Sequence, residues 1–230
     1  MASNNDTTII YYTANHESDA FEQKIRDNIL RQSHGMPIIS VSQKPIDFGR
    51  NICVGNQPFC ELNMLRQQLI GLEAADTKFA LAAESDVLYP PEYFAFIPPT
   101  EDNVYRYTNV WILFPQLSVD HLYEAGHIPN NFDGFWKKRY TEGAQICGRE
   151  YWIKNLKAIL GSNPEWFDDR KHHPKTFFAK DEYSWSSWSP VVSVKTRNGL
   201  RKYTATSHVS TNNLEYWGSD DEVRTMLDIN

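Results

Sequence analysis

Two carboxylates one residue apart, Glu84 and Asp86, directly follow the apolar run 79–83. Such a near-continuous apolar run is typical of a strand buried on both faces of a parallel sheet, and the prolines at 90 and 91 end it. Ligands of open α/β sheets bind beyond the carboxyl ends of the strands. Side chains at i and i+2 of an extended segment point to the same side, so we expect Glu84 and Asp86 to face one divalent cation, Mg²⁺ or Mn²⁺, which prefer oxygen ligands. The alternative is an ordinary acidic turn.

The elements before this motif alternate between strand and helix. The β-branched and aromatic segment 7–13 predicts a first strand, and the spacing Asp19-x-x-Glu22 predicts a capping box that opens a helix. Segment 38–42 predicts a second strand, and a loop with Gly and Pro spans 43–55. A second helix begins at Pro58 and carries leucines three and four residues apart, at positions 62, 65, 69 and 72. Residues 1–90 therefore predict a β-α-β-α-β layer with a parallel sheet.

The second half of the chain is less regular. Residues 104–114 predict one or two strands, and a polar, glycine-containing connection follows from 115 to 141. A helix is expected over roughly 144–160, and segment 190–195 predicts a late strand. Because no linker or repeat interrupts the chain, we expect one two-part domain over residues 1–230.

Composition excludes several classes of protein. The 230 residues include three scattered cysteines, Cys53, Cys60 and Cys147, which fits reduced thiols. The formal net charge of −6 argues mildly against a protein that coats nucleic acid. The first residues lack the features of a secretory signal, and no apolar run approaches 18 residues. We therefore expect a cytoplasmic protein without a membrane span. The sequence also lacks the GxSxG, GxGxxG and P-loop patterns.

These features together resemble a nucleotide-sugar glycosyltransferase of the GT-A fold. The resemblance rests on the order of strands and helices over about 7–114 and on Glu84-Ser85-Asp86, which stands where that family has Asp-x-Asp. A weaker match extends through 143–160 and 191–200 to Tyr216-Trp-Gly218. The resemblance implies an α/β fold with a mostly parallel twisted sheet, in which residues 1–114 bind a nucleoside diphosphate sugar, such as a UDP-sugar, and residues 115–230 form a smaller mixed half that binds the acceptor. The departure from the family pattern is Glu for the first Asp.

The resemblance also implies a set of donor-binding residues. Asp86 and Glu84 would hold Mn²⁺ or Mg²⁺ on the diphosphate, with His208 as a further candidate ligand. The remaining candidates for the nucleotide lie at the first strand's end, in the loop 43–55, on the second helix and in the acidic motif: Thr13, Ala14, Asn15, Lys44, Arg50, Asn51, Arg66, Gln67 and Ser85. Lys44 and Arg50 are the expected phosphate contacts. For each loop residue the alternative is solvent-facing charge or local turn bonding.

The acceptor half offers candidates for a catalytic base. An inverting enzyme needs a carboxylate within hydrogen-bond reach of the attacking hydroxyl, and we consider Asp181, Glu182 and Asp168. The basic clusters 137–139 and 170–171 suggest one acceptor, a hydroxymethylated base in DNA modified by a phage-type enzyme, which would act in the host cytoplasm. A saccharide, lipid-linked or protein acceptor stays equally open. The alternatives to a glycosyltransferase are a nucleotidyltransferase and a non-catalytic nucleotide-sugar-binding module.

One further motif is set aside. Trp185-Ser-Ser-Trp-Ser189 matches the WSxWS pattern of cytokine receptors, which are secreted, disulfide-bonded β-sandwiches. The alternating α/β first half excludes that architecture, so the match is a coincidence. The two tryptophans either stack on a sugar or base, or cover the core.

Overall fold

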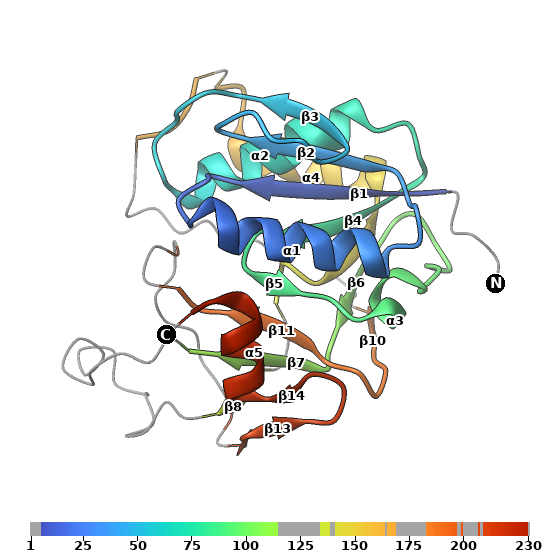
Figure 1. Cartoon of the computed structure of the whole chain (residues 1–230). Helices are drawn as coiled ribbons and strands as arrows, with labels where there is room; N and C mark the ends of the chain where they lie inside the picture. Colours follow the sequence, from blue (N-terminus) through green and yellow to red (C-terminus); the bar gives the residue numbers. More distant parts are fainter. Residues whose placement is uncertain are drawn as a thin grey trace.

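A seven-stranded, mostly parallel sheet forms the first layer of the computed structural model (Figure 1), in the order β10-β6-β9-β4-β1-β2-β3. The structure describes residues 6–114, 134–138, 141–163, 165–168, 183–196, 199, 207 and 209–229. The strands of this sheet, in chain order, are β1 (Thr7–Thr13), β2 (Ile38–Ser42), β3 (Arg50–Cys53), β4 (Phe79–Glu84), β6 (Val104–Tyr107), β9 (Gln145–Gly148) and β10 (Tyr183–Trp185).

The centre of this sheet is parallel, as the sequence predicts. Strand β1 is buried along its whole length and lies between β2 and β4. Its register aligns Thr13 with Ser42 of β2 and Tyr12 with Glu84 of β4, so the three strands end side by side. Strand β3 extends the sheet beyond β2, within a segment that the sequence predicts as loop.

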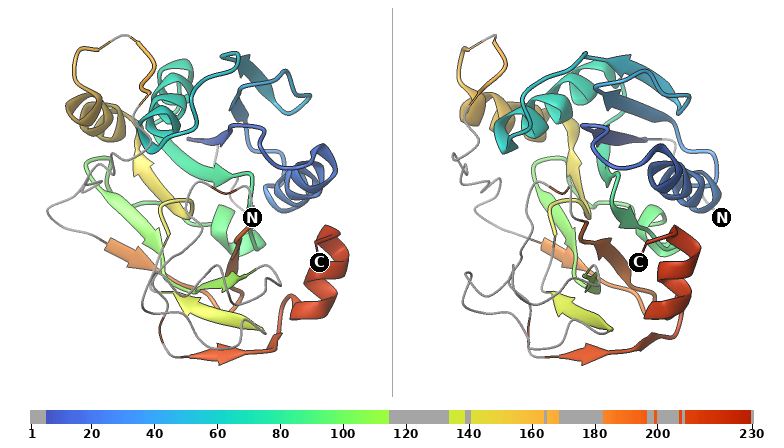
Figure 2. Two further views of the ribbon diagram at one scale, coloured as in Figure 1. Left: turned by 90° about the vertical axis from the view of Figure 1, so that its left-hand side faces the viewer. Right: turned by 60° about the vertical axis from the view of Figure 1, so that its left-hand side comes forward.

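Helices cover both faces of the sheet. Alternate side chains of β1 point to opposite faces: Ile9 and Tyr11 pack with helix α1 (Asp19–Gln32), whereas Ile10 and Tyr12 pack with α2 (Glu61–Ala74) and α4 (Arg149–Leu160). The two views in Figure 2 show α1 on one side of the sheet and α2 with α4 on the other. Burial on both faces explains why β4 is a near-continuous apolar run and why β1 consists of β-branched and aromatic residues.

A second, five-stranded sheet in the order β12-β8-β7-β11-β5 lies next to the first and forms the lower part of Figure 1. Its strands are β5 (Val87–Leu88), β7 (Val110–Leu113), β8 (Phe135–Lys138), β11 (Val191–Val194) and β12 (Ser210–Thr211). The remaining elements are α3 (Pro91–Phe94), the hairpin β13 (Asn213–Leu214) with β14 (Gly218–Ser219), and α5 (Asp220–Leu227). One apolar core runs from the α1 face of the first sheet into this second sheet. Among the described residues no helix has the length and apolarity needed to cross a membrane.

Besides the predicted loop that contains β3, the second helix begins at Glu61 rather than at Pro58, and three further local predictions are wrong. The helix expected over 144–160 begins only at Arg149, because Gln145–Gly148 is strand β9, buried between β4 and β6. The N-cap of α1 is Ser18, whose hydroxyl accepts from Phe21 N, and Glu22 turns into the protein instead of closing a capping box. The acidic motif is a turn rather than a continued strand, since Ser85 and Asp86 link β4 to β5.

Candidate functional site

The ends of β1, β2 and β4, together with the turn at Ser85 and Asp86, form what we call the carboxyl edge of the first sheet. This is the edge at which parallel α/β sheets bind ligands. The second sheet meets it directly, because Val194 at the end of β11 donates its N–H to the Asp86 carbonyl at 2.7 Å. Both halves of the chain therefore contribute residues to the carboxyl edge.

Glu84 is held by contacts from both sides. The Tyr12 hydroxyl donates to Glu84 Oε1 at 2.9 Å, and the Glu84 N–H donates to the Tyr89 hydroxyl at 2.9 Å. Tyr89 in turn donates to the Gly143 carbonyl at 2.6 Å. Gly143 lies so close that a Cβ there would meet Glu84 Oε2 at 2.4 Å. The carboxylate of Glu84 thus occupies a fixed position against a residue that has no side chain.

Glu84 and Asp86 interact through their charges although the motif is a turn. Burial raises the pKa of Glu84 to about 7, and the charge of Asp86 adds to this, whereas Lys195 and the Tyr12 hydrogen bond oppose it. Burial also raises the pKa of Asp86, which Lys195 and Lys138 oppose. A cation bound between these two half-buried carboxylates would favour their ionised forms and offset the repulsion between them.

Several residues of this site escape sequence reasoning. Tyr12, Tyr89, Gly143 and Lys195 come from four different segments, and no spacing in the sequence connects them to Glu84. The strand predicted at 190–195 is correct as β11, but only its pairing with β5 brings its end to Asp86. The Thr196 hydroxyl then donates to the Glu17 carboxylate, which links this segment to the loop after β1.

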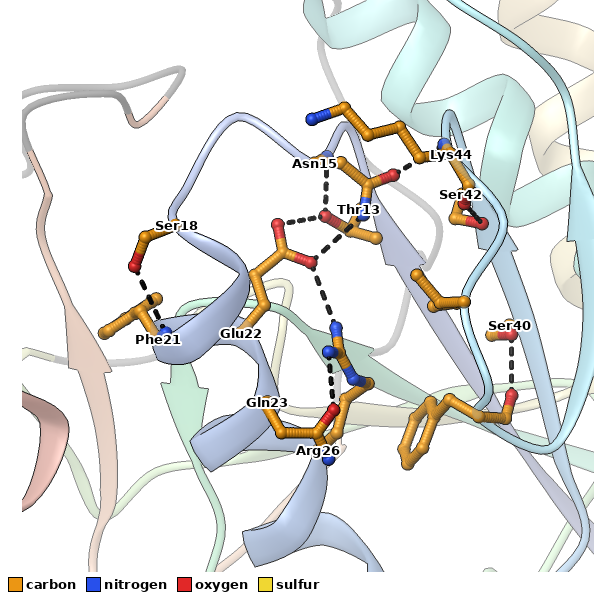
Figure 3. Close-up of polar contacts among 12 residues, drawn as sticks. Thr13, Asn15, Ser18, Phe21, Glu22, Gln23, Arg26, Ser40, Ser42 and Lys44 are labelled. Atoms are coloured by element: carbon orange, nitrogen blue, oxygen red, sulfur yellow. Dashed lines mark hydrogen bonds and ion pairs between the residues drawn. The ribbon is translucent and has the colours of Figure 1, made fainter.

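At the end of β1, the candidate nucleotide-binding side chains are engaged inside the protein (Figure 3). The Thr13 hydroxyl donates to Glu22 Oε1 at 2.8 Å. Asn15 donates from Nδ2 to Glu22 Oε2 at 3.2 Å and accepts at Oδ1 from the N–H groups of Gln43 and Lys44, both at 2.9 Å. Thr13 and Asn15 are therefore buried supports of this edge, and Ala14 between them is half-buried.

The loop and helix candidates divide by position. Asn51 donates to Ser40 and Ser42, and Gln67 donates to the Thr13 carbonyl at 2.8 Å, so both brace the strand ends. Lys44 lies at the carboxyl edge with an exposed side chain. Arg50 is different: it begins β3 at the opposite edge, and its guanidinium donates to the Ala74 carbonyl at the end of α2.

Arg66 also lies apart from Glu84 and Asp86. It stands over the rings of Trp166 and Phe167 and donates to the Asn163 carbonyl at 2.8 Å. Asn63 of α2 bonds both the N–H and the carbonyl of Phe167. The exposed candidate base Asp168 follows directly, so it is placed against α2 rather than at the junction of the two sheets.

The other candidates in the second half are only partly described. Asp181, Glu182 and His208 lie outside the described residues, as do Arg139, Arg170 and Lys171. Lys137 and Lys138 belong to β8. The ammonium of Lys137 donates to Asn109 Oδ1 at 2.7 Å and stands over the Trp111 ring, so it holds the second sheet together.

The two tryptophans of the WSxWS match have different surroundings. Trp185 is half-buried, stacks on Phe96 at 4.4 Å and packs edge-on against Tyr107 at the border of the core. Trp188 is 61% exposed and contacts Tyr216 edge-to-face at 5.6 Å. One tryptophan therefore covers the core and the other lies open on the surface.

The donor set at the carboxyl edge fits a hard divalent cation in part. Glu84 and Asp86 supply oxygen ligands of the kind that Mg²⁺ and Mn²⁺ take. Within the part of the chain that the structure describes, no three His, Cys, Asp or Glu side chains gather closely enough to hold a metal by themselves. Among the described residues, a cation at Glu84 and Asp86 would therefore need further ligands, such as oxygens from a bound molecule.

No protein-family model matches the sequence, and no curated protein matches it. Its structure resembles a crystal structure of Staphylococcus aureus TarS, residues 1–349 in complex with UDP-GlcNAc, with a TM-score of 0.50 at 12% identity. That alignment covers 96% of this chain and 65% of the TarS chain, so this protein spans less than two thirds of the crystallised chain.

Two further structures are more distant. A glycosyltransferase involved in glycosylation of the major capsid of PBCV-1 aligns with a TM-score of 0.45, 12% identity, and coverage of 81% of this chain and 92% of that one. The bifunctional IspDF from Campylobacter jejuni aligns with a TM-score of 0.42, 13% identity, and coverage of 79% and 49%. The TarS likeness shows the fold: this chain has the GT-A-type α/β architecture found in nucleotide-sugar glycosyltransferases.

Proposed function

We propose that this protein is a metal-dependent glycosyltransferase that moves a sugar from a nucleoside diphosphate sugar to a hydroxyl acceptor. The observation that carries the proposal is the position of Glu84 and Asp86 at the carboxyl end of β4, beside the end of β1. The fold supports the same class of reaction, because the TarS structure of this architecture was determined with UDP-GlcNAc. We therefore propose a UDP-sugar as the first donor to test.

Asp86 and Glu84 would hold Mn²⁺ or Mg²⁺, and the diphosphate of the donor would supply further oxygens. When bound, the ion would act as a Lewis acid that stabilises the leaving diphosphate. The residues of the chain prepare this site. Tyr12 and Gly143 fix the Glu84 carboxylate, and Lys195 brings a positive charge from the second sheet.

The order of the strand ends supports a direction for the donor. Strands β2 and β4 flank β1, so their ends lie about 10 Å apart at the usual strand spacing. With the diphosphate at Asp86, the nucleoside would extend across the end of β1 toward Lys44. In this arrangement Arg50 and Arg66 take no part, since their guanidinium groups are bound elsewhere.

The acceptor side rests on fewer observations. Asp181 and Glu182, which immediately precede β10 in the sequence and lie outside the described residues, stay our proposed bases. A hydroxymethylated base in DNA remains one acceptor to test against saccharides. If DNA is the acceptor, transfer should fall steeply with salt as phosphate contacts release counterions; a salt-independent rate would favour a carbohydrate or small molecule.

The test is a panel of UDP-, GDP-, ADP- and dTDP-sugars with and without Mn²⁺, measured by thermal shift and by slow hydrolysis of the donor. A glycosyltransferase should be stabilised by one of them in a metal-dependent way and should hydrolyse it slowly. Binding without hydrolysis would favour a non-catalytic binding module. Turnover of nucleoside triphosphates instead would show that the protein is a nucleotidyltransferase.

A further inference from the structure

Asn15 has an uncommon backbone conformation and an unusual set of partners. Its φ is +52°, in the left-handed region that Asn tolerates better than most residues. Its side-chain oxygen accepts from two consecutive main-chain N–H groups, those of Gln43 and Lys44, each at 2.9 Å. One amide side chain thereby fastens the start of the β2–β3 loop to the end of β1.

Glu22 fixes Asn15 from the other side. Its carboxylate is 2% exposed and accepts from the Thr13 hydroxyl, from Asn15 Nδ2 and from Arg26 Nη1. The bond to Nδ2 determines which way the Asn15 amide faces, because the nitrogen must point to the carboxylate and the oxygen then points to the loop. A buried carboxylate on α1 thus orients a hydrogen-bond acceptor in the loop directly after β1 (Figure 3).

Lys44 is the residue that this arrangement immobilises. Its N–H is bound by Asn15 Oδ1, and its carbonyl accepts from the Ser42 hydroxyl at 2.6 Å. Ser42 is itself bonded by Asn51 Nδ2 at 2.8 Å. The main chain of Lys44 is therefore fixed at both its donor and its acceptor, while its side chain is exposed at the carboxyl edge.

We propose that Asn15 and Glu22 are positioning residues that hold segment 43–44, and with it the Lys44 side chain, in the arrangement that receives the nucleotide of the donor. The inference rests on the proposed function for the identity of the ligand. Neither residue contacts the donor; each acts through the loop. A loop that is ordered before binding does not have to be ordered by the ligand, which raises affinity without a new contact.

The first readout needs no ligand. Amide hydrogen exchange of Gln43 and Lys44 should accelerate at least about tenfold in Asn15→Ala and Asn15→Gly, because both amides lose their acceptor. Glycine accepts the left-handed backbone, so Asn15→Gly removes the amide group without strain. Asn28→Ala is the matched control: Asn28 is an equally buried asparagine that bonds the main chain of Tyr89, and its loss should leave exchange at 43 and 44 unchanged.

The second readout is the affinity for UDP, GDP, ADP and dTDP with Mn²⁺, with KM and kcat for the matching donor sugar. Both Asn15 variants should bind the nucleotide about tenfold more weakly, the factor for ordering roughly one backbone residue on binding, with KM raised and kcat nearly unchanged. Glu22→Gln retains one acceptor oxygen and should fall between wild type and Asn15→Gly.

The outcomes are distinct. Unchanged exchange at Gln43 and Lys44 in both Asn15 variants would show that Asn15 does not hold segment 43–44. Faster exchange with unchanged nucleotide affinity would show that these contacts stabilise the fold and do not position the donor. A wild-type protein that binds none of the four nucleotides would refute the proposed function and remove the ligand from this inference, whatever the exchange rates show.

Discussion

Replacing Glu22 with glutamine should remove a pH dependence of stability that the buried carboxylate creates. Burial raises the pKa of Glu22 to about 6; the Thr13 hydrogen bond and the charge of Arg26 lower it, and the charges of Glu17 and Asp19 raise it further. The starting value is 4.5. The folded protein therefore holds a proton at this position at pH values where the unfolded chain has lost it.

The sign and size follow from proton linkage. Because the pKa is higher in the folded state, the folded state binds more protons between about pH 4.5 and 6, and the free energy of unfolding falls as pH rises through this range. The shift of about 1.5 units, from 4.5 to 6, corresponds to about 2 kcal/mol at about 1.4 kcal/mol per unit. Glu22 thus stabilises the fold most when it is protonated, and this contribution is lost once the pH exceeds 6.

The assay is urea unfolding of wild type and Glu22→Gln at several pH values from 4.5 to 7.5. The difference between the two proteins isolates this carboxylate from Glu84 and from all other titrating groups. We expect wild type to lose about 1.6 kcal/mol relative to the variant between the lowest and highest pH, because the unfolded carboxyl is already half ionised at pH 4.5. Asp27→Asn, on the exposed side of α1, serves as the control and should show no such change. A difference between wild type and Glu22→Gln that stays constant with pH would refute the reasoning.

Two further predictions concern the site and the core. Gly143→Ala places a methyl group 2.4 Å from Glu84 Oε2, so the carboxylate must leave the position that Tyr12 holds, at a cost of about 1 kcal/mol of stability. We expect metal-dependent nucleotide affinity, measured by titration calorimetry, to fall about tenfold. Unchanged affinity would contradict the role of Glu84 in the donor site. Trp185→Ala should lower the free energy of unfolding by about 3 kcal/mol, because the ring stacks on Phe96. Trp188 is exposed, so Trp188→Ala should lower it by less than about 1 kcal/mol. Equal losses in chemical denaturation would disprove the different roles of the two tryptophans.

Local patterns predict the parallel part of the fold well. The β-branched and aromatic segment 7–13, the apolar run 79–83 and the leucine spacing after Pro58 correspond to β1, β4 and α2. Burial on both faces of a sheet, or on one stripe of a helix, leaves a direct pattern in the sequence. Strand β9 leaves no such pattern. Its four residues are stabilised by partners far away in the chain, on β4 and β6, and they run directly into a helix that extends the same apolar pattern.

The site divides in the same way. Glu84 and Asp86 are identified by their position after a buried strand, which is local information. Thr13 and Asn15 lie at the end of β1, as predicted, but their side chains form hydrogen bonds within the protein, to Glu22 and to the loop amides. The contribution of Lys195 depends on the pairing of β11 with β5, and no spacing in the sequence specifies that pairing.

The most direct test of the central claim is Mn²⁺ binding followed by electron paramagnetic resonance, with and without the nucleoside diphosphate that the donor panel identifies. Two carboxylates alone make a weak site, so we expect wild type to bind Mn²⁺ tightly only when the nucleotide is present. Asp86→Asn should abolish this binding at a nearly unchanged melting temperature. Asp76 is an exposed acid before the start of β4, and Asp76→Asn should behave as wild type. Nucleotide-dependent Mn²⁺ binding that is equal in wild type and Asp86→Asn would contradict the assignment of the carboxyl edge as the donor site.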